Sequence, residues 1–165
     1  MNRNEGQPQS MRFRPTLGGC VIQDAKMARS IEESYLEKLQ AAAAYTYRSI
    51  MTKEVDCTVS ALFEEIAEEE DEHFRLLGEL ILALGANPTV RTGIRVPPIS
   101  GCDRKEETVR TLLQVIEEAI KEEKRKIDRL QILMGKTDDR VVRSLLDYLI
   151  SDGHRHVEQL RYVMG

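Results

Sequence analysis

Glu70 and His73 stand three residues apart in the segment EIAEEEDEHFRLL, a spacing that puts both side chains on one face of a helix. A carboxylate on an apolar helix face is destabilising unless it is paired or binds a metal. The pattern therefore predicts that Glu70 and His73 point into a protein core, whereas Glu68, Glu69 and Glu72 are predicted to lie on a solvated face. The residues at helical spacing around Glu70 are all apolar: Phe63, Ile66, Ala67, Phe74 and Leu77.

Glu123 and His156 are the second pair of candidate ligands, and both lie among apolar residues at helical spacing. Three residues before His156 stands Gly153. Glycine inside a helix is less stable than alanine by about 1 kcal/mol, so its place on an apolar face is unusual. We expect the space beside Gly153 to open a coordination position for water or an external carboxylate.

The two halves of the chain share one offset. The motif at residues 70–73 recurs 83 positions later at residues 153–156, and the same offset aligns Glu123 with Gln40. Gln40 also has apolar or small residues around it at helical spacing. One offset thus aligns inward positions on all four predicted helices. Gln40 is expected to offer its side-chain amide oxygen as a ligand at the inward position of the first helix. Glu37, one turn earlier, is an alternative donor.

Four long helices would position these side chains. Acidic N-caps, terminal glycines and mixed three- and four-residue apolar spacing predict where the helices begin and end. The predicted helices span residues 24–52 (capped by Asp24), 58–84 (capped by Asp56 or Thr58 and followed by Gly85), 103–134, and 138–164 (capped by Asp138 or Asp139).

The segment between the second and third helices, residues 86–103, contains Asn87-Pro88 and Pro97-Pro98 and is expected to be extended. A helix of some 27 residues is roughly 40 Å long, and 18 extended residues reach roughly 60 Å. This segment can therefore return the chain to the far end of the molecule. The expected fold is all-α, a four-helix bundle of two antiparallel hairpins joined by a long crossover.

Composition limits the alternatives. The 24 Lys and Arg residues against 28 Asp and Glu give a net charge of −4, which does not favour nucleic-acid binding. No apolar run approaches the roughly 18 residues that a membrane span needs. Cys20, Cys57 and Cys102 include no CxxC pair, which excludes a rubredoxin-type or zinc-knuckle site and favours a reduced, cytoplasmic setting. Residues 1–23 lack a signal-peptide pattern and are expected to form a flexible arm before a domain of residues 24–164.

Over residues 24–164 the chain resembles the ferritin-like di-iron superfamily, most closely its small rubrerythrin-like members. Residues 40–47 look like the first-helix motif Glu-x-x-Ala-x-x-x-Tyr of this family, with Gln40 in place of Glu. Residues 70–73 match the second-helix motif Glu-x-x-His in full, and residues 119–130 look like the third helix. Residues 150–156 look like the fourth-helix motif with its Glu replaced by glycine.

The resemblance implies a site for two metal ions, each bound by one Glu and one His and both bridged by further Glu residues. Of the four carboxylates this chain retains Glu70 and Glu123, which neutralise one divalent cation. We therefore expect one ion, iron or alternatively manganese or another divalent metal, at Glu70, Glu123 and His156. The second position, at Gln40, Glu70 and His73, is expected to bind weakly or stay empty.

Three functions are compatible with this expectation. The first is a rubrerythrin-like oxidoreductase that reduces peroxide or activates dioxygen with electrons from an external donor protein. The second is iron binding and storage. The third is a structural or interaction bundle without catalysis, in which the retained side chains form a buried hydrogen-bond network. The bundle is also expected to pair as a homodimer and to bind neither nucleic acid nor membrane.

Three neighbouring side chains complete the predictions. Tyr47 is expected to pack in the core with its hydroxyl group on a carboxylate. Asp152 and His154, on either side of Gly153, are expected to point away from the site.

Overall fold

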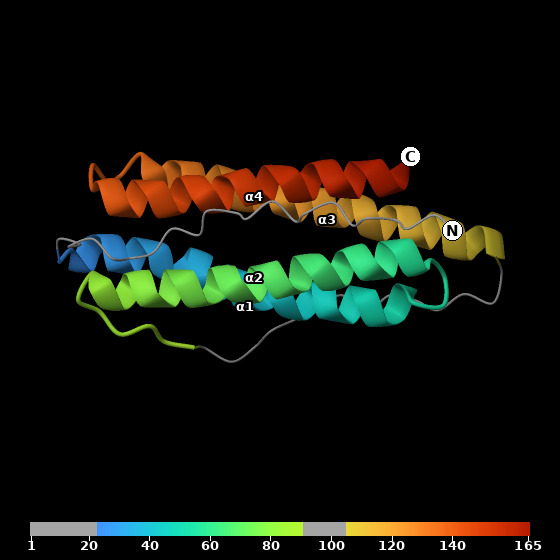
Figure 1. The fold of residues 1–165 in the computed structure, drawn as a ribbon, viewed down its shortest axis with the longest axis horizontal. Helices are drawn as coiled ribbons and strands as arrows, with labels where there is room; N and C mark the ends of the chain where they lie inside the picture. Colours follow the sequence, from blue (N-terminus) through green and yellow to red (C-terminus); the bar gives the residue numbers. More distant parts are fainter. Residues whose placement is uncertain (1–22, 91–104) are drawn as a thin grey trace, which may run out of the picture.

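The computed structural model describes residues 23–90 and 105–165, which form four helices and, within these ranges, no strand. The helices are α1 (Ala25–Thr52), α2 (Cys57–Ala83), α3 (Lys105–Met134) and α4 (Arg140–Met164) (Figure 1). The predicted all-α fold is confirmed. All but the last residue of the N-terminal arm expected for residues 1–23, and most of the predicted crossover, lie outside the described residues.

Local sequence signals determine the helix ends. The carboxylates of Asp24, Asp56 and Asp139 accept backbone N–H groups from the first turns of α1, α2 and α4, respectively. Asp56 and Asp139 are thus the caps, rather than Thr58 and Asp138. Gly85 follows α2 with a φ of +91°, a left-handed conformation that glycine adopts without a steric penalty.

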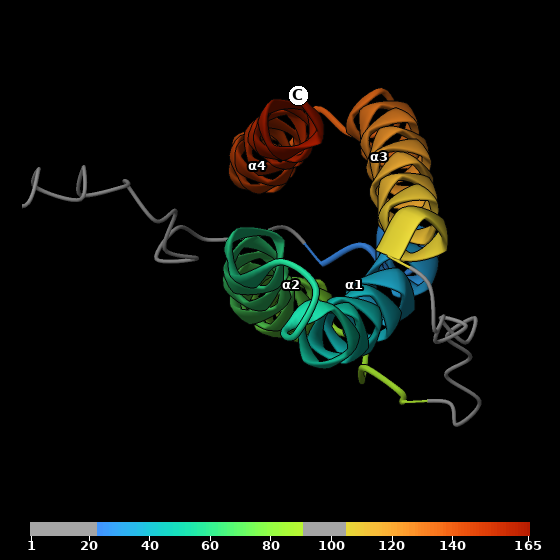
Figure 2. The same ribbon diagram turned by 90° about the vertical axis from the view of Figure 1, so that its right-hand side faces the viewer.

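The helices form two hairpins that lie side by side. α1 packs along α2, and α3 packs along α4; the hairpins meet through α1 with α3 and α2 with α4 (Figure 2). α2 ends at the opposite end of the bundle from the start of α3 (Figure 1). Within the described part of the chain, no helix carries the length of apolar sequence that crossing a bilayer requires.

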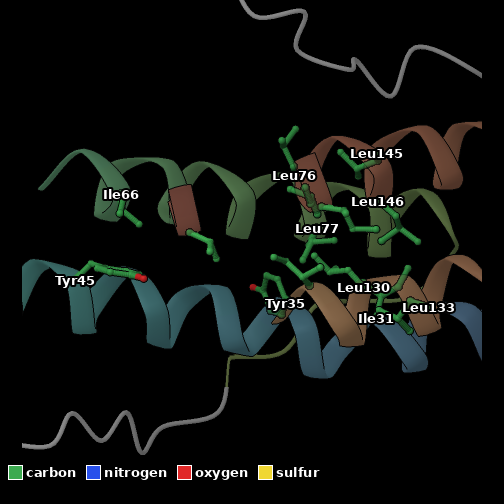
Figure 3. Packing of buried hydrophobic residues seen from close by; sticks show 14 of the residues in the cluster. Ile31, Tyr35, Tyr45, Ile66, Leu76, Leu77, Leu130, Leu133, Leu145 and Leu146 are labelled. Atoms are coloured by element: carbon green, nitrogen blue, oxygen red, sulfur yellow. The ribbon is translucent and has the colours of Figure 1, made fainter. Parts of the chain in front are cut away.

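The core changes from apolar to charged near the middle of the bundle. Figure 3 shows Tyr45 and Ile66 on one side and Tyr35, Leu77 and Leu130 on the other. The core also contains side chains that are both polar and buried, such as Lys38 between Tyr35 and Tyr45 in the sequence, which is destabilising unless these groups satisfy one another. Those discussed below are Lys38, Glu70, His73, Glu123, Lys126, Asp152 and His156.

Candidate metal centre

Glu70 on α2 and Glu123 on α3 face each other in the middle of the bundle, and both are fully buried. His156 on α4 places Nδ1 3.5 Å from Glu123 Oε2 and 3.9 Å from Glu70 Oε1. His73 places Nδ1 3.7 Å from Glu70 Oε2. Ligand atoms of Glu70, Glu123 and His156 all lie within 4.8 Å of one another, so one cation could contact all three. Four of the five predicted ligands are therefore together.

The outer nitrogen of each histidine is held by a carboxylate. His73 Nε2 lies 2.9 Å from Asp152 Oδ2, and His156 Nε2 lies 2.7 Å from Glu69 Oε2. Arg155 bonds both Glu69 and Asp152 and so ties the two carboxylates together. A carboxylate on the outer nitrogen fixes the orientation of the ring, an arrangement typical of histidines that bind metals. The Nδ1 atom of His73 consequently faces Glu70, and that of His156 faces both Glu70 and Glu123.

Two sequence-based expectations fail here. Glu69 was expected on a solvated face and Asp152 away from the site, but each binds a site histidine on the opposite helix. Asp152 is only 6% exposed. Both residues flank the inward face of their helix, where a short side chain can reach the neighbouring helix at the α2–α4 contact. His154, in contrast, is exposed, as expected.

Two lysines that the sequence analysis did not select complete the cluster. Lys126 Nζ lies 2.6 Å from Oε1 of both Glu70 and Glu123. Lys38 Nζ lies 2.9 Å from Glu70 Oε2. The Lys38 side chain is 2% exposed and the Lys126 side chain 9%. Two ammonium groups therefore neutralise the two central carboxylates.

Each ionised group in this cluster is stabilised by its neighbours. Burial raises the pKa of Glu70, but Lys126 and Lys38 outweigh it, so this pKa lies well below its usual range. Burial also raises the pKa of Glu123, and Lys126 outweighs it to give a pKa of about 2. Burial lowers the pKa of Lys126, but Glu123 and Glu70 raise it above its usual value. These three groups are ionised at neutral pH.

Burial likewise lowers the pKa of His156, but the neighbouring carboxylates of Glu123 and Glu69 raise it to about 9. His156 is therefore protonated at neutral pH while no metal is bound. Because an imidazole must be neutral to act as a ligand, metal binding here would release a proton.

The inward face of α1 differs from the predicted one. Gln40 is exposed and Tyr47 is half-buried, whereas Lys38 and Tyr45 point into the bundle. The seven-residue spacing of the first-helix motif is thus kept, but two residues earlier. Tyr45 donates a 2.7 Å hydrogen bond to Glu123, the role predicted for Tyr47. The prediction that Gln40 is a ligand is therefore wrong. The offset of 83 assumed that the two hairpins have equal lengths, whereas α1 continues farther past the site than α3 does.

Glu37 is also not an inward donor. Its Oε1 accepts a 2.7 Å hydrogen bond from Arg129 Nη1 on α3, and its side chain remains 29% exposed. It lies at the edge of the bundle, outside the buried cluster.

Gly153 is explained by packing. A Cβ atom at this position would lie 2.8 Å from Ile127 Cγ1, closer than two carbon atoms can approach. The isoleucine side chain therefore occupies the space that a larger residue would need. The open coordination position expected beside Gly153 is not present.

The comparison with protein families matches residues 28–165 to the ferritin-like domain. The chain belongs to the ferritin family. This match covers all four helices, and it confirms the resemblance to the ferritin-like superfamily. No curated protein sequence matches the chain.

Solved structures give the same fold for this ferritin-family protein. A Desulfovibrio desulfuricans bacterioferritin, whose diiron site was determined in different catalytic states, aligns with a TM-score of 0.73 and 18% identity over 85% of this chain and 78% of that one. Chlorobium tepidum ferritin aligns with a TM-score of 0.70 and 16% identity over 87% and 85%. An open-pore ferritin from the archaeon Archaeoglobus fulgidus aligns with a TM-score of 0.71 and 14% identity over 87% and 85%.

The family implies iron, and the residues present fit one ion. Three buried atoms of this cluster lack a hydrogen-bond partner, namely Glu123 Oε2, His73 Nδ1 and His156 Nδ1, whereas Glu70 Oε2 is paired with Lys38. Unpartnered buried polar atoms are rare and call for an explanation such as a bound ion. Carboxylate oxygen and imidazole nitrogen are donors that iron and manganese accept.

The same residues do not fit two ions. Glu70 separates two cation positions: Glu123, His156 and Lys126 lie on its Oε1 side, and His73 and Lys38 on its Oε2 side. On the Oε2 side the ammonium group of Lys38 takes the place of a cation. No second carboxylate of α1 or α4 ligates at the centre, since the inward positions hold Lys38 and Gly153. The donors therefore suffice for one ion on the Oε1 side.

Proposed function

We propose that this ferritin-family protein binds a single divalent metal ion at Glu70, Glu123 and His156, iron being the metal that the family implies. The observation that carries the proposal is that ligand atoms of these three buried residues all lie within 4.8 Å of one another. Among these residues, Glu123 Oε2 and His156 Nδ1 have no hydrogen-bond partner, and the His156 ring is held by the Glu69 carboxylate. Three protein ligands leave coordination positions for water or a small ligand. A bound iron ion would supply Lewis acidity and one-electron redox chemistry at those positions.

Lys38 favours a protein that holds one metal ion over a rubrerythrin-like enzyme that reduces peroxide at a pair of ions. Lys38 contributes a fixed positive charge on the Oε2 side of Glu70, where a second ion would bind. Its ammonium group has no vacant orbital with which to accept a ligand and cannot change oxidation state. This protein would therefore hold a single iron, with Lys38 balancing part of the carboxylate charge.

Metal analysis tests the proposal directly. Protein purified without chelator and loaded anaerobically with Fe²⁺, or in parallel with Mn²⁺, should contain one ion per chain by elemental analysis. His156→Gln and Glu123→Gln should lose this ion. Glu118→Gln, an exposed position on the same helix as Glu123, should retain it. Two ions per chain in the unmodified protein would refute the charge argument.

A second candidate is a metal-free bundle with a structural or interaction role, and the ion pairs of Lys38 and Lys126 favour it. These pairs satisfy both central carboxylates without any external cation. Thermal unfolding separates the candidates, because a ligand that binds only the folded state raises the midpoint. A midpoint that does not change with saturating Mn²⁺ or Fe²⁺ would favour the metal-free role.

A further inference from the structure

Lys126 occupies the point that a metal ion shared by the two central carboxylates would need. Its ammonium nitrogen is 2.6 Å from one oxygen of Glu70 and 2.6 Å from one oxygen of Glu123. A second cation placed among the same oxygens would be repelled by the first and crowded by it. A metal ion can therefore bind at Glu70, Glu123 and His156 only if the Lys126 ammonium group leaves.

A pocket beside the cluster provides space into which the displaced Lys126 side chain can move. It has a volume of about 260 Å³, and Lys126 forms part of its wall. Ala41 and Ala44 on α1 leave room, and Glu37 and Glu122 bring carboxylates to its lining. Arg48 and Arg125 also line it, and Arg48 already pairs with Glu122, which leaves Glu37 as the carboxylate for the lysine. The Lys126 side chain is 9% exposed, whereas those of Glu70 and Glu123 are fully buried, so the lysine is the most exposed of these three groups.

Glu37 is the natural new partner for the displaced ammonium group. Burial raises the pKa of Glu37, and the positive charges of Arg129 and Lys126 oppose that rise, so the field of Lys126 already reaches this carboxylate. Glu37 holds Arg129 through one oxygen, and a carboxylate has lone pairs for additional donors.

We propose that Lys126 is an exchangeable internal cation that binds Glu70 and Glu123 in the metal-free protein and moves into the pocket beside Glu37 when a metal ion takes its place. This inference rests on the proposed single-metal site. The exchange keeps a positive charge between the carboxylates in both states. It also weakens metal binding, because the incoming ion must break two buried ion pairs. Lys38, on the other oxygen of Glu70, takes no part.

The first experiment measures Mn²⁺ affinity by electron paramagnetic resonance of the free ion. Lys126→Met removes the ammonium group and keeps an unbranched side chain of similar length, so Mn²⁺ should bind about tenfold more tightly or better, still at one ion per chain. Lys124→Met, an exposed position two residues earlier, is the matched control and should leave the affinity unchanged. Equal affinities of Lys126→Met and the unmodified protein would overturn the exchange.

A double-mutant cycle tests the destination of the lysine. Glu37→Gln should weaken Mn²⁺ binding several-fold in the unmodified protein, because it removes the carboxylate that receives the ammonium group. The same substitution should have no effect on Mn²⁺ affinity when Lys126 is methionine. An equal effect of Glu37→Gln in both backgrounds would overturn the assignment of Glu37.

Labelling of the unmodified protein tests the movement without relying on a variant that must fold. Reductive methylation followed by mass spectrometry should modify Lys126 several-fold faster with saturating Mn²⁺ than with chelator, while Lys38 remains protected in both. Unchanged labelling of Lys126 at saturation would overturn the exchange and leave the metal site standing. If neither the unmodified protein nor Lys126→Met binds Mn²⁺, the single-metal function itself is wrong, and the exchange with it.

Discussion

At the scale of the residue, Glu70 is the centre of the charged cluster because its two oxygens hold two different ammonium groups, those of Lys38 and Lys126. Each oxygen of this carboxylate therefore has an ion-pair partner. Removal of this carboxylate takes a counter-charge from two buried ammonium groups that cannot be hydrated. An uncompensated buried charge is far more destabilising than the loss of a surface ion pair.

Glu70→Gln is therefore expected to lower the free energy of unfolding by about 3–5 kcal/mol in metal-free protein. Urea denaturation followed by circular dichroism in the presence of chelator measures this change. Glu68→Gln, an exposed position on the same helix, should change it by no more than about 0.5 kcal/mol. Similar small effects of both substitutions would show that the lysines do not depend on Glu70.

Gly153 makes a second prediction at this scale. Alanine is the better helix former by about 1 kcal/mol. At this position, however, its Cβ would lie 2.8 Å from Ile127 Cγ1, and overpacking of this kind costs about 1–3 kcal/mol. Gly153→Ala should therefore destabilise the protein on balance, as measured by the thermal midpoint. In an Ile127→Ala background, which removes the clashing atom, the same substitution should be neutral or stabilising; destabilisation in both backgrounds would contradict the packing explanation.

At the scale of the element, the helix ends could be predicted from sequence and the inward face of α1 could not. Capping by Asp24, Asp56 and Asp139 depends on residues within one turn, so it is visible in the sequence. The inward face of α1 passes through residues 41–44, four alanines that present the same small side chain on every side. The spacing of apolar residues therefore cannot show which side of α1 faces the core in this segment.

The burial of Lys38 could not be predicted from sequence either, because it depends on a charge interaction between two helices. A lysine is ordinarily exposed, so a sequence pattern assigns it to the surface. Only the carboxylate of Glu70, on another helix, explains its burial. Glu70, His73, Glu123 and His156, by contrast, could be predicted because each lies in a strongly apolar stripe of its own helix.

The hydroxyl group of Tyr45 provides a test of the α1 register. Tyr45→Phe removes a 2.7 Å hydrogen bond to a buried, ionised carboxylate, an interaction worth about 1.5–3 kcal/mol. The free energy of unfolding should fall by that amount, measured by urea denaturation. Tyr47→Phe, the half-buried tyrosine two positions later, should have the smaller effect. The reverse order would restore the register in which Gln40 points inward.

At the scale of the whole molecule, the four helices are held together by an apolar core on both sides of a charged centre whose central carboxylates face lysines of the same chain. The metal-free protein should therefore unfold in one cooperative, helical transition in the presence of chelator. Saturating Mn²⁺ should raise the midpoint, since an excess of about 100 times the dissociation constant adds about 2.7 kcal/mol. Differential scanning calorimetry with and without chelator checks both expectations. A chain that is unfolded until metal is added would contradict the role given to Lys38 and Lys126.

The two ammonium groups have one more consequence, which concerns the order of events in the cell. Buried carboxylates that face only a captured metal ion are destabilising until that ion binds. Here the polypeptide carries its own positive charges to the same acids. Folding of the chain is therefore expected not to depend on the supply of metal, so that a newly made copy would reach the same fold with or without iron.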